Sequence, residues 1–305
     1  MIMDIVSIGE PLMELSNTEK GIYKEGYGGD TSNFLMAAAR QGAKTAYFTQ
    51  IGQDTFGDAF MDLWESEGVD TSHVNRLATA HTGLYFITYT EKGHEFTYFR
   101  AGSAASKMEP SDVPEKLIES SKLLHISGIS QAISSSACDA VFEACKIARK
   151  NHVTVTYDPN IRLKLWSKER AAAIINATIP YCDIFMPSLE DAQSITSMED
   201  PEKIADYYHS IGVKVVVLKL GSEGVMVSAD GMKEIIPGYK VETVDQTGAG
   251  DTFDGAFCSR YIKGISPMEC ARYANAAAAL STKGYGAVTP IPTEKEVEEF
   301  LLAQK

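Results

Sequence analysis

The pattern of apolar and polar positions along most of the chain predicts strands and helices that follow one another in turn. Short apolar runs rich in β-branched residues predict strands, and apolar residues recurring every three or four positions predict helices. The expected strands cover residues 4–9, 45–51, 123–127, 153–157, 183–186 and 213–220. The expected helices cover residues 31–42, 56–67, 134–150, 168–177, 249–263, 267–282 and 293–303, with short helices before 210. The run at 213–220 is almost continuously apolar, as in a parallel strand covered on both faces, so the pattern predicts an α/β fold.

Two stretches depart from this alternation. Residues 82–90 and 95–100 are β-rich runs joined by Glu91-Lys92-Gly93-His94, which predicts a hairpin. Because a hairpin does not belong to an alternation of strands and helices, we interpret it as an insertion. A second hairpin, over residues 225–228 and 233–236, is expected at the edge of the sheet.

Composition and charge limit the classes of function. The chain has 305 residues, 44% of them hydrophobic, so it can bury a sizeable core. Its net charge of −13 argues against general binding to nucleic acids or anionic membranes. An enzyme of this charge with anionic ligands would need basic side chains or a divalent cation inside its site. The five cysteines show no zinc spacing, and we find neither a signal peptide nor a transmembrane run, so we expect a reduced, cytoplasmic protein.

A glycine-rich turn at residues 244–250 leads directly into an apolar helical run. Gly248 and Gly250 permit sharp bends and close approach of a ligand. The first turn of a helix offers unpaired N–H groups and partial positive charge, which suit a phosphate. Asp251, where the helix is expected to begin, could take a proton from a hydroxyl beside that phosphate. An anion cradle and a base so close together suggest phosphoryl transfer, although Asp251 could equally be a helix cap.

Two motifs carry a resemblance to a known family. The run Asp245-x-Thr-Gly-Ala-Gly-Asp-Thr-Phe-x-Gly-Ala-Phe257 resembles the C-terminal signature of the ribokinase-like (PfkB) carbohydrate kinases, with Gln246 as one departure. The run Gly28-Gly29-Asp30-Thr31-Ser32-Asn33 resembles their N-terminal signature, although a glycine turn before a helix is ordinary when taken alone. The resemblance runs nearly end to end, from Gly9-Glu10 to the helix near Asn275.

The resemblance implies a fold and a sugar site. The expected fold is one ribokinase-like α/β domain over residues 1–305, with a mostly parallel sheet covered by helices on both faces. A small β-rich lid, made of inserted segments at about 11–27 and 82–106, would cover the sugar. The expected sugar-binding residues are Gly29, Asp30, Asn33, Tyr85, Tyr98, Arg100, Asn160, Arg162 and Asp251. Strand packing is the alternative for both tyrosines.

Two arginine-bearing segments bear on the substrate. Tyr98-Phe99-Arg100-Ala101-Gly102-Ser103-Ala104-Ala105 and Asp158-Pro159-Asn160-x-Arg162 resemble segments of the 2-keto-3-deoxygluconate kinases within the family. An arginine can bind a carboxylate or a phosphate through two parallel hydrogen bonds, so two arginines favour an acid sugar. Similar segments occur in fructokinase-like relatives, where the arginine can serve the transferred phosphate. A surface salt bridge is the further alternative for each arginine.

The nucleotide is expected at Leu218-Lys219-Leu220-Gly221-Ser222-Glu223-Gly224, which resembles the nucleotide loop of the family. No P-loop motif and no dinucleotide fingerprint are present, which argues against a P-loop kinase and a nicotinamide dehydrogenase. The expected ATP-binding residues are Ser188, Lys219, Gly221, Ser222, Gly224, Gly248, Gly250 and Asn275. Where relatives often carry Asn-x-x-Glu, this chain has Ser188-Leu189-Glu190-Asp191, so either Asp191 or Glu190 would order Mg²⁺. A monovalent cation such as K⁺ is possible near Asp245, Thr247 and residues 284–287.

These expectations combine into a reaction. Asp251 would accept the proton of a primary hydroxyl that attacks the γ-phosphorus of ATP. The amides of Gly248, Ala249 and Gly250, with Arg162 and Mg²⁺, would stabilise the phosphoryl charge. The expected partner is a small sugar or sugar acid, with no nucleic acid or membrane, and the lid edge would support a homo-oligomer. A catalytically silent sugar-binding protein is the alternative from another class.

Overall fold

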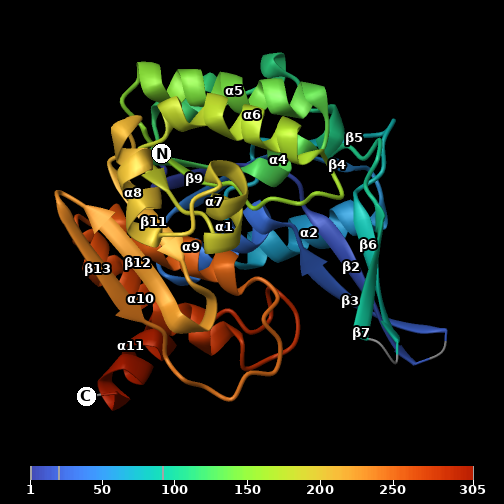
Figure 1. Ribbon diagram of the computed structural model, residues 1–305. Helices are drawn as coiled ribbons and strands as arrows, with labels where there is room; N and C mark the ends of the chain where they lie inside the picture. The colour runs from blue at the N-terminus through green and yellow to red at the C-terminus, as the bar shows by residue number, and fades with distance from the viewer. Residues whose placement is uncertain (1, 20, 91–92, 305) are drawn as a thin grey trace.

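The computed structural model describes residues 2–19, 21–90 and 93–304, and it contains two β-sheets (Figure 1). The strand order of the main sheet is β13-β12-β11-β10-β9-β8-β1-β4-β5. Neighbouring strands from β11 to β5 run parallel, whereas β12 and β13 form an antiparallel hairpin at the edge. The strands are β1 (Ile5–Ile8), β4 (Thr45–Gly52), β5 (Val74–Leu77), β8 (Leu123–Ser127), β9 (Thr154–Asp158), β10 (Ile184–Phe185), β11 (Val215–Lys219), β12 (Gly224–Ala229) and β13 (Met232–Pro237).

Helices cover both faces of the main sheet. One face packs against α1 (Asp30–Arg40), α2 (Thr55–Ser66), α9 (Ala249–Tyr261), α10 (Pro267–Ser281) and α11 (Glu294–Ala303). The other face packs against α3 (Glu115–Glu119), α4 (Gly128–Ala132), α5 (Ser135–Lys150), α6 (Lys168–Thr178), α7 (Leu189–Thr196) and α8 (Pro201–Ser210). Every residue of β1, β4 and β8 is buried, as expected for parallel strands between two helical layers. The predicted α/β architecture is therefore confirmed.

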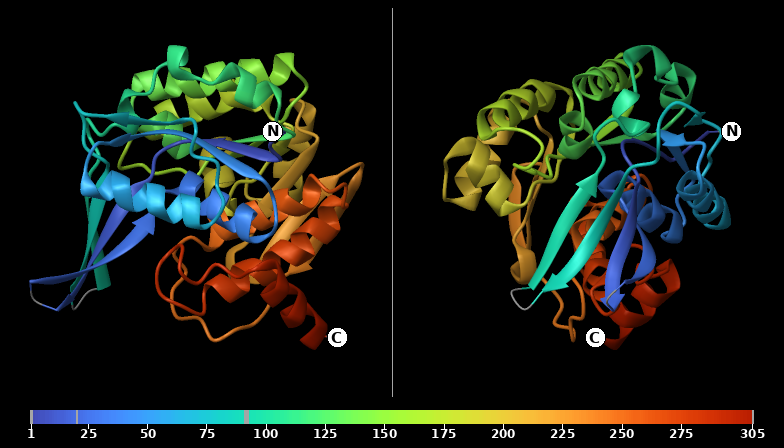
Figure 2. Two further views of the ribbon diagram at one scale, coloured as in Figure 1. Left: turned by 180° about the vertical axis from the view of Figure 1, so that it is seen from behind. Right: turned by 90° about the vertical axis from the view of Figure 1, so that its right-hand side faces the viewer.

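The second sheet, which we call the lid sheet, lies to one side of the main sheet (Figure 1; Figure 2, left). It consists of β2 (Leu12–Glu19), β3 (Ile22–Gly28), β6 (Leu84–Thr90) and β7 (Gly93–Phe99), in the order β3-β2-β6-β7. The predicted hairpin is confirmed by the antiparallel pairing of β6 with β7, and its residues Glu91 and Lys92 lie outside the described residues. The lid sheet joins the two inserted segments, because β2 pairs with β6.

Several local expectations need correction. The helix predicted over residues 31–42 starts one residue earlier, because α1 begins at Asp30 and its N-cap is Gly29. Gly29 has a φ of 96°, and a Cβ there would lie 2.3 Å from the carbonyl oxygen of Glu10. Only glycine therefore allows this turn to pack against the end of β1. The pattern does not indicate β2, β3, β5, α3 or α4, since these elements are short or lack a regular apolar period.

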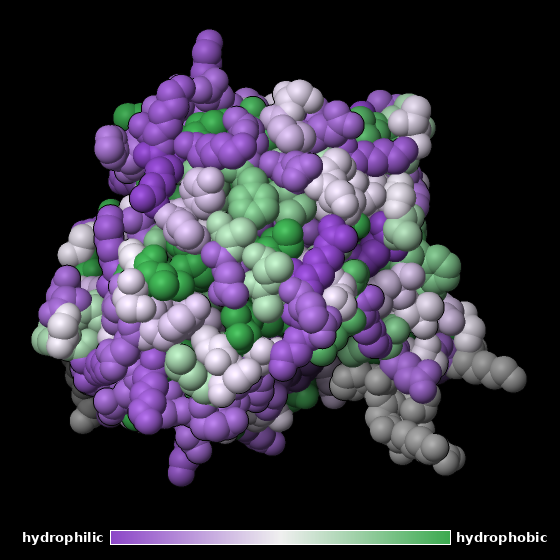
Figure 3. All heavy atoms as spheres, turned by 45° about the horizontal axis from the view of Figure 1, so that its top comes forward, coloured by the Kyte–Doolittle hydropathy of each residue, from purple (hydrophilic) through white to green (hydrophobic). Residues whose placement is uncertain are grey.

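One face of the molecule shows how hydrophobic and hydrophilic atoms are distributed on its surface. Figure 3 brings the α5–α6 side toward the viewer, and its hydrophobic patches lie mostly toward the middle, interrupted and bordered by hydrophilic atoms. Within the described residues, no helix combines the length and apolarity needed to cross a membrane.

Candidate active site

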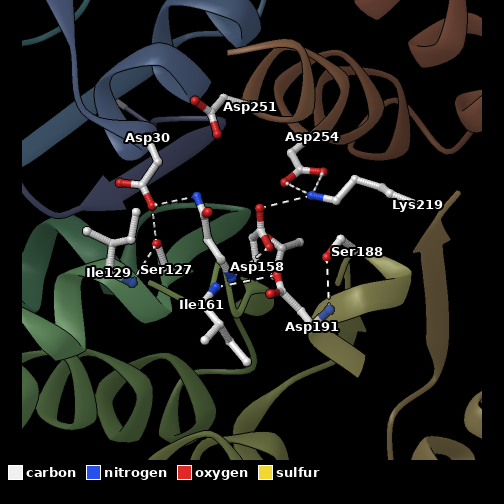
Figure 4. Close-up of polar contacts among 12 residues, drawn as sticks. Asp30, Ser127, Ile129, Asp158, Ile161, Ser188, Asp191, Lys219, Asp251 and Asp254 are labelled. Carbon is white, nitrogen blue, oxygen red and sulfur yellow. Dashed lines mark hydrogen bonds and ion pairs between the residues drawn. The ribbon is translucent and has the colours of Figure 1, made fainter. Parts of the chain in front are cut away.

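The site lies at the carboxyl ends of the parallel strands, close to the point where the strand order reverses around β1. Strand β1 has β4 on one side and β8 on the other, and ligands of open α/β sheets bind in the crevice beside such a reversal. The first turns of α1 and α9 meet above this edge. Figure 4 shows Asp30, Asp158, Asp251 and Asp254 directed toward one central space.

Asp251 is the third residue of α9, and it does not cap the helix. The N-cap is Gly248, with a φ of 74°, and no side chain caps this end. The capping alternative for Asp251 is therefore wrong, and its carboxylate accepts a hydrogen bond of 2.8 Å from Asn33 Nδ2 on α1. Of the three amides expected to bind phosphate, that of Ala249 already donates to the Gln246 carbonyl, at 3.2 Å.

The surroundings of Asp251 make it a weak acid. Burial raises its pKa to about 7, and repulsion from Asp30 and Asp158 adds to the effect, whereas Asn33 and Lys219 oppose it. A carboxylate with a pKa near neutrality is well matched to general base catalysis. The geometry and the proton affinity of Asp251 therefore fit the predicted base.

Asp30 and Asn160 belong to one hydrogen-bonded cluster. Asp30 Oδ2 accepts hydrogen bonds from Ser127 Oγ and from Asn160 Nδ2, the latter at 3.2 Å. Asn160 follows the Pro159 turn with a φ of 35°, and its N–H donates to Asp158 Oδ1 at 3.1 Å. Burial raises the pKa of Asp30. The loop after β9 and the start of α1 are thereby fixed side by side.

Lys219, at the end of β11, lies between two buried carboxylates. Its Nζ is 2.9 Å from Asp158 Oδ2 and 3.0 Å from Asp254 Oδ2 (Figure 4). Both carboxylates raise the pKa of Lys219, and its ammonium lowers the pKa of Asp158. Our sequence reasoning missed Asp254, because its contact with Lys219 joins positions 35 apart in the chain and leaves no local signal.

In the acidic segment after β10, the two candidates for ordering Mg²⁺, Asp191 and Glu190, have different surroundings. Asp191 Oδ2 accepts a hydrogen bond from the Ile161 N–H at 3.4 Å, and the Asp191 N–H donates to Ser188 Oγ at 3.0 Å. Burial and the nearby Asp158 raise the pKa of Asp191 to about 6. Glu190 is exposed, so Asp191 is the better placed of the two. Among the described residues there is no group of three or more His, Cys, Asp or Glu side chains that could hold a metal by itself.

The expected nucleotide residues fall into two groups. Ser188 and Lys219 form an isolated parallel bridge at the sheet edge, beside the carboxylates. Gly221 and Ser222 lie in an exposed turn, and Gly224 begins β12. Asn275 lies apart, because its Nδ2 donates to the carbonyls of Ile236 and Pro237, each at 3.1 Å, and so joins α10 to β13.

The lid sheet and Arg100, which directly follows β7, contribute three expected residues, each with a partner. Tyr85 is buried and donates to Glu14, and its ring lies 5.6 Å from that of Tyr98. Arg100 forms an ion pair with the fully buried carboxylate of Glu10, and Tyr98 lies 5.6 Å beneath its guanidinium. Our sequence reasoning did not assign Glu10 or Glu14, because these contacts join segments far apart in the chain.

Arg162 is exposed, and the one hydrogen bond found for its guanidinium within the described chain goes to the Ile161 carbonyl, at 3.1 Å. Its charge partly offsets the rise that burial causes in the pKa of Asp30. The structure therefore places Arg162 at the margin of the carboxylate cluster rather than inside it.

A cavity of about 670 Å³ lies between the lid sheet and the C-terminal segments that include Val244–Thr247 and Tyr285–Thr289. Asp245 lines it, accepts hydrogen bonds from the N–H and hydroxyl of Thr247, and accepts one of 2.9 Å from the Gly286 N–H. The residues expected near a monovalent cation are thus in mutual contact.

Comparison with known proteins agrees with this geometry. The family model "pfkB family carbohydrate kinase" matches residues 3–294. The chain is 34% identical to a 2-dehydro-3-deoxygluconokinase of Thermoproteus tenax, covering 99% of this chain and 95% of the relative. It is 30% identical to a fructokinase of Solanum tuberosum, covering 97% and 95%.

A solved structure extends the likeness to the whole fold. The ribokinase II candidate from Escherichia coli, in complex with ATP and Mg²⁺, is 27% identical, covers 99% of each chain and superposes with a TM-score of 0.92. Together with the family match, it confirms the prediction of a ribokinase-like, ATP-dependent sugar kinase. The chain belongs to the pfkB family of carbohydrate kinases.

Proposed function

We propose that this kinase transfers the γ-phosphoryl group of ATP to the primary hydroxyl of 2-keto-3-deoxygluconate, giving the 6-phosphate. The observation that carries the proposal is the half-buried carboxylate of Asp251, which lies opposite Asn33 in the first turn of α9 and has a pKa of about 7. The sugar would lie between Gly29, Asp30 and Asn33 on one side and the lid sheet on the other. Asn33 Oδ1 supports this placement, because it is buried without a partner in the described chain and can accept a sugar hydroxyl.

In the proposed reaction, Asp251 accepts the hydroxyl proton as the oxygen attacks the γ-phosphorus in line. The N–H groups at the turn of Gly248 and Gly250 donate to the phosphoryl oxygens, and Arg162 approaches from the margin of the site. Bound Mg²⁺ would neutralise phosphate charge, with Asp191 positioned to hold one of its water ligands. Closure of the lid sheet would exclude water and limit hydrolysis of ATP.

The choice of an acid sugar rests on Arg100, Arg162 and the likeness to the 2-dehydro-3-deoxygluconokinase. Arg100 Nε is buried and has no partner within the described chain, so a sugar carboxylate would supply an acceptor if the side chain reoriented. One contact favours the alternative, a fructokinase-like enzyme for a neutral ketose. Glu10 already pairs with Arg100 and offsets its charge before any substrate arrives.

A coupled assay of ADP release, run with keto-deoxy acids, ketoses and nucleosides, tests the proposal. We expect turnover of 2-keto-3-deoxygluconate, and Arg100→Met and Arg162→Met should each lower kcat and raise KM for it. Turnover of fructose without turnover of any keto-deoxy acid would establish the alternative. Absence of sugar-dependent ADP release with every compound would instead support a silent sugar-binding protein.

We also propose that the lid sheet mediates a homo-oligomer. Ile22, Tyr23 and Phe99 leave 55%, 48% and 53% of their surfaces exposed on it. The ring of Phe86 lies 5.3 Å from that of Tyr23 and 5.7 Å from that of Phe99, so the aromatic side chains form a cluster. A second copy of the chain could cover this cluster.

We propose separately that the region around Asp245 binds a monovalent cation such as K⁺.

A further inference from the structure

Lys219 is held from two elements that also build the site. Its Nζ bonds Asp158 at the end of β9 and both carboxylate oxygens of Asp254 on α9, the latter at 3.0 and 3.2 Å. The side chain of Asp254 is only 1% exposed and that of Asp158 only 8%. Burying two carboxylates so deeply has a small cost in free energy only when a cation and hydrogen bonds compensate for their lost hydration. Lys219 supplies both.

The ammonium of Lys219 also lies beside the glycine turn. A Cβ built at Gly250 would lie 3.8 Å from Lys219 Nζ, so this charge is close to the first turn of α9. Asp254 follows Asp251 by three positions on the same helix, so the two side chains are neighbours on its surface. One helix thereby positions both the candidate base and an anchor for the nearby cation.

We infer that Asp254 and Asp158 are positioning residues, which hold the ammonium of Lys219 beside Gly250 where it stabilises the charge of the transferred phosphoryl group. The inference rests on the proposed function, because it requires that phosphoryl transfer take place at this turn. An anchored cation does not have to move as negative charge develops on the phosphoryl group. Charges that are fixed in advance in this way accelerate a reaction most.

The same arrangement affects the proton affinity of Asp251. The charged groups that act on Asp251 are Asp30 on α1, Asp158 on β9 and Lys219 on β11. Lys219 is the cation among them, and it favours the ionised form of Asp251. Loss of its charge should therefore raise the pKa of Asp251 and move the acid limb of kcat/KM to higher pH.

A double-mutant cycle with Lys219→Met and Asp254→Asn tests whether Asp254 acts through Lys219. We expect each single variant to lower kcat by about tenfold, with KM for the sugar changed less than about twofold. The combined variant should be no slower than Lys219→Met alone, because Asp254 has no ammonium to position once Lys219 is replaced. In Lys219→Met the acid limb should move up by about one pH unit.

Other results would overturn the inference. If the two substitutions multiply to about a hundredfold loss, or Asp254→Asn leaves kcat unchanged, Asp254 does not act through Lys219. An unmoved acid limb in Lys219→Met would show that the ammonium does not act on Asp251. A wild-type enzyme that releases no ADP with any sugar would instead overturn the proposed function.

Two further variants keep the cycle interpretable. Lys214→Met is the matched control, because Lys214 lies immediately before the opposite end of β11, is 75% exposed and pairs with Asp183 at 2.7 Å. It should leave kcat and the pH profile unchanged. If Lys219→Met does not fold, Lys219→Gln replaces it, since an uncharged amide can still donate to both carboxylates.

Discussion

At the residue scale, the pair formed by Asp251 and Asn33 joins two segments that are 218 positions apart in the chain. Both residues could be selected from the sequence, because each belongs to a short glycine-rich motif before a helix. The network around them could not be. Glu10, Glu14 and Asp254 make their contacts through tertiary packing, and no local pattern indicates which cation or hydroxyl will face a given carboxylate.

The raised pKa of Asp251 predicts a pH-dependent stability difference. The folded protein keeps the proton of Asp251 up to about pH 7, whereas an unfolded aspartate loses it near pH 4, so ionisation increasingly disfavours folding between these values. Asp251→Asn removes this cost and keeps a partner for Asn33. We expect its thermal midpoint to exceed that of the wild type at pH 8, with a smaller difference at pH 5. Calorimetry checks this, and a difference independent of pH would contradict it.

At the element scale, the close approach of α1 and α9 brings the two motifs together. A Cβ at Gly255 of α9 would lie 2.5 Å from the Phe34 carbonyl oxygen and 2.7 Å from Ala37 Cβ on α1. The sequence indicates both helices and their apolar faces. It could not indicate that they pack against each other with Gly255 at the contact, because that depends on their common placement on one face of the sheet.

Gly255→Ala should therefore destabilise the protein, although alanine is the better helix former by roughly 0.5–1 kcal/mol. The added methyl group overlaps backbone atoms of α1, and overpacking of this kind costs about 1–3 kcal/mol. We expect a lower free energy of unfolding in urea and a lower kcat, because Asp251 moves away from Asn33. Equal or greater stability would show that the helices separate at no cost.

At the scale of the whole molecule, the alternation of strands and helices indicates only that the lid sheet is an insertion. Its β6–β7 hairpin was predicted, but the pairing of β2 with β6 joins segments about 70 residues apart and leaves no local signal. The nine-stranded sheet was more predictable, because burial on both faces requires the continuous apolar runs that are visible in the sequence.

The exposed aromatic cluster predicts that the lid sheet carries the contact between subunits. Phe99→Glu places a charge in the cluster and should shift the molecular mass measured by light scattering toward that of one chain. Ile235→Glu is the matched control, since Ile235 is 63% exposed on β13, away from the lid sheet, and should leave the mass unchanged. A wild-type protein with the mass of one chain would contradict the proposal.

The central claim is that Asp251 removes the proton from the hydroxyl of an acid sugar. Its most direct test is the rate of formation of the 6-phosphate from 2-keto-3-deoxygluconate and ATP, for the wild type and Asp251→Asn as a function of pH. We predict a wild-type kcat/KM that falls tenfold per pH unit below about pH 7, and a kcat about 10²–10⁴-fold lower in Asp251→Asn, without that pH dependence. A variant that retains the wild-type rate, or a wild type that forms no 6-phosphate, would contradict the claim.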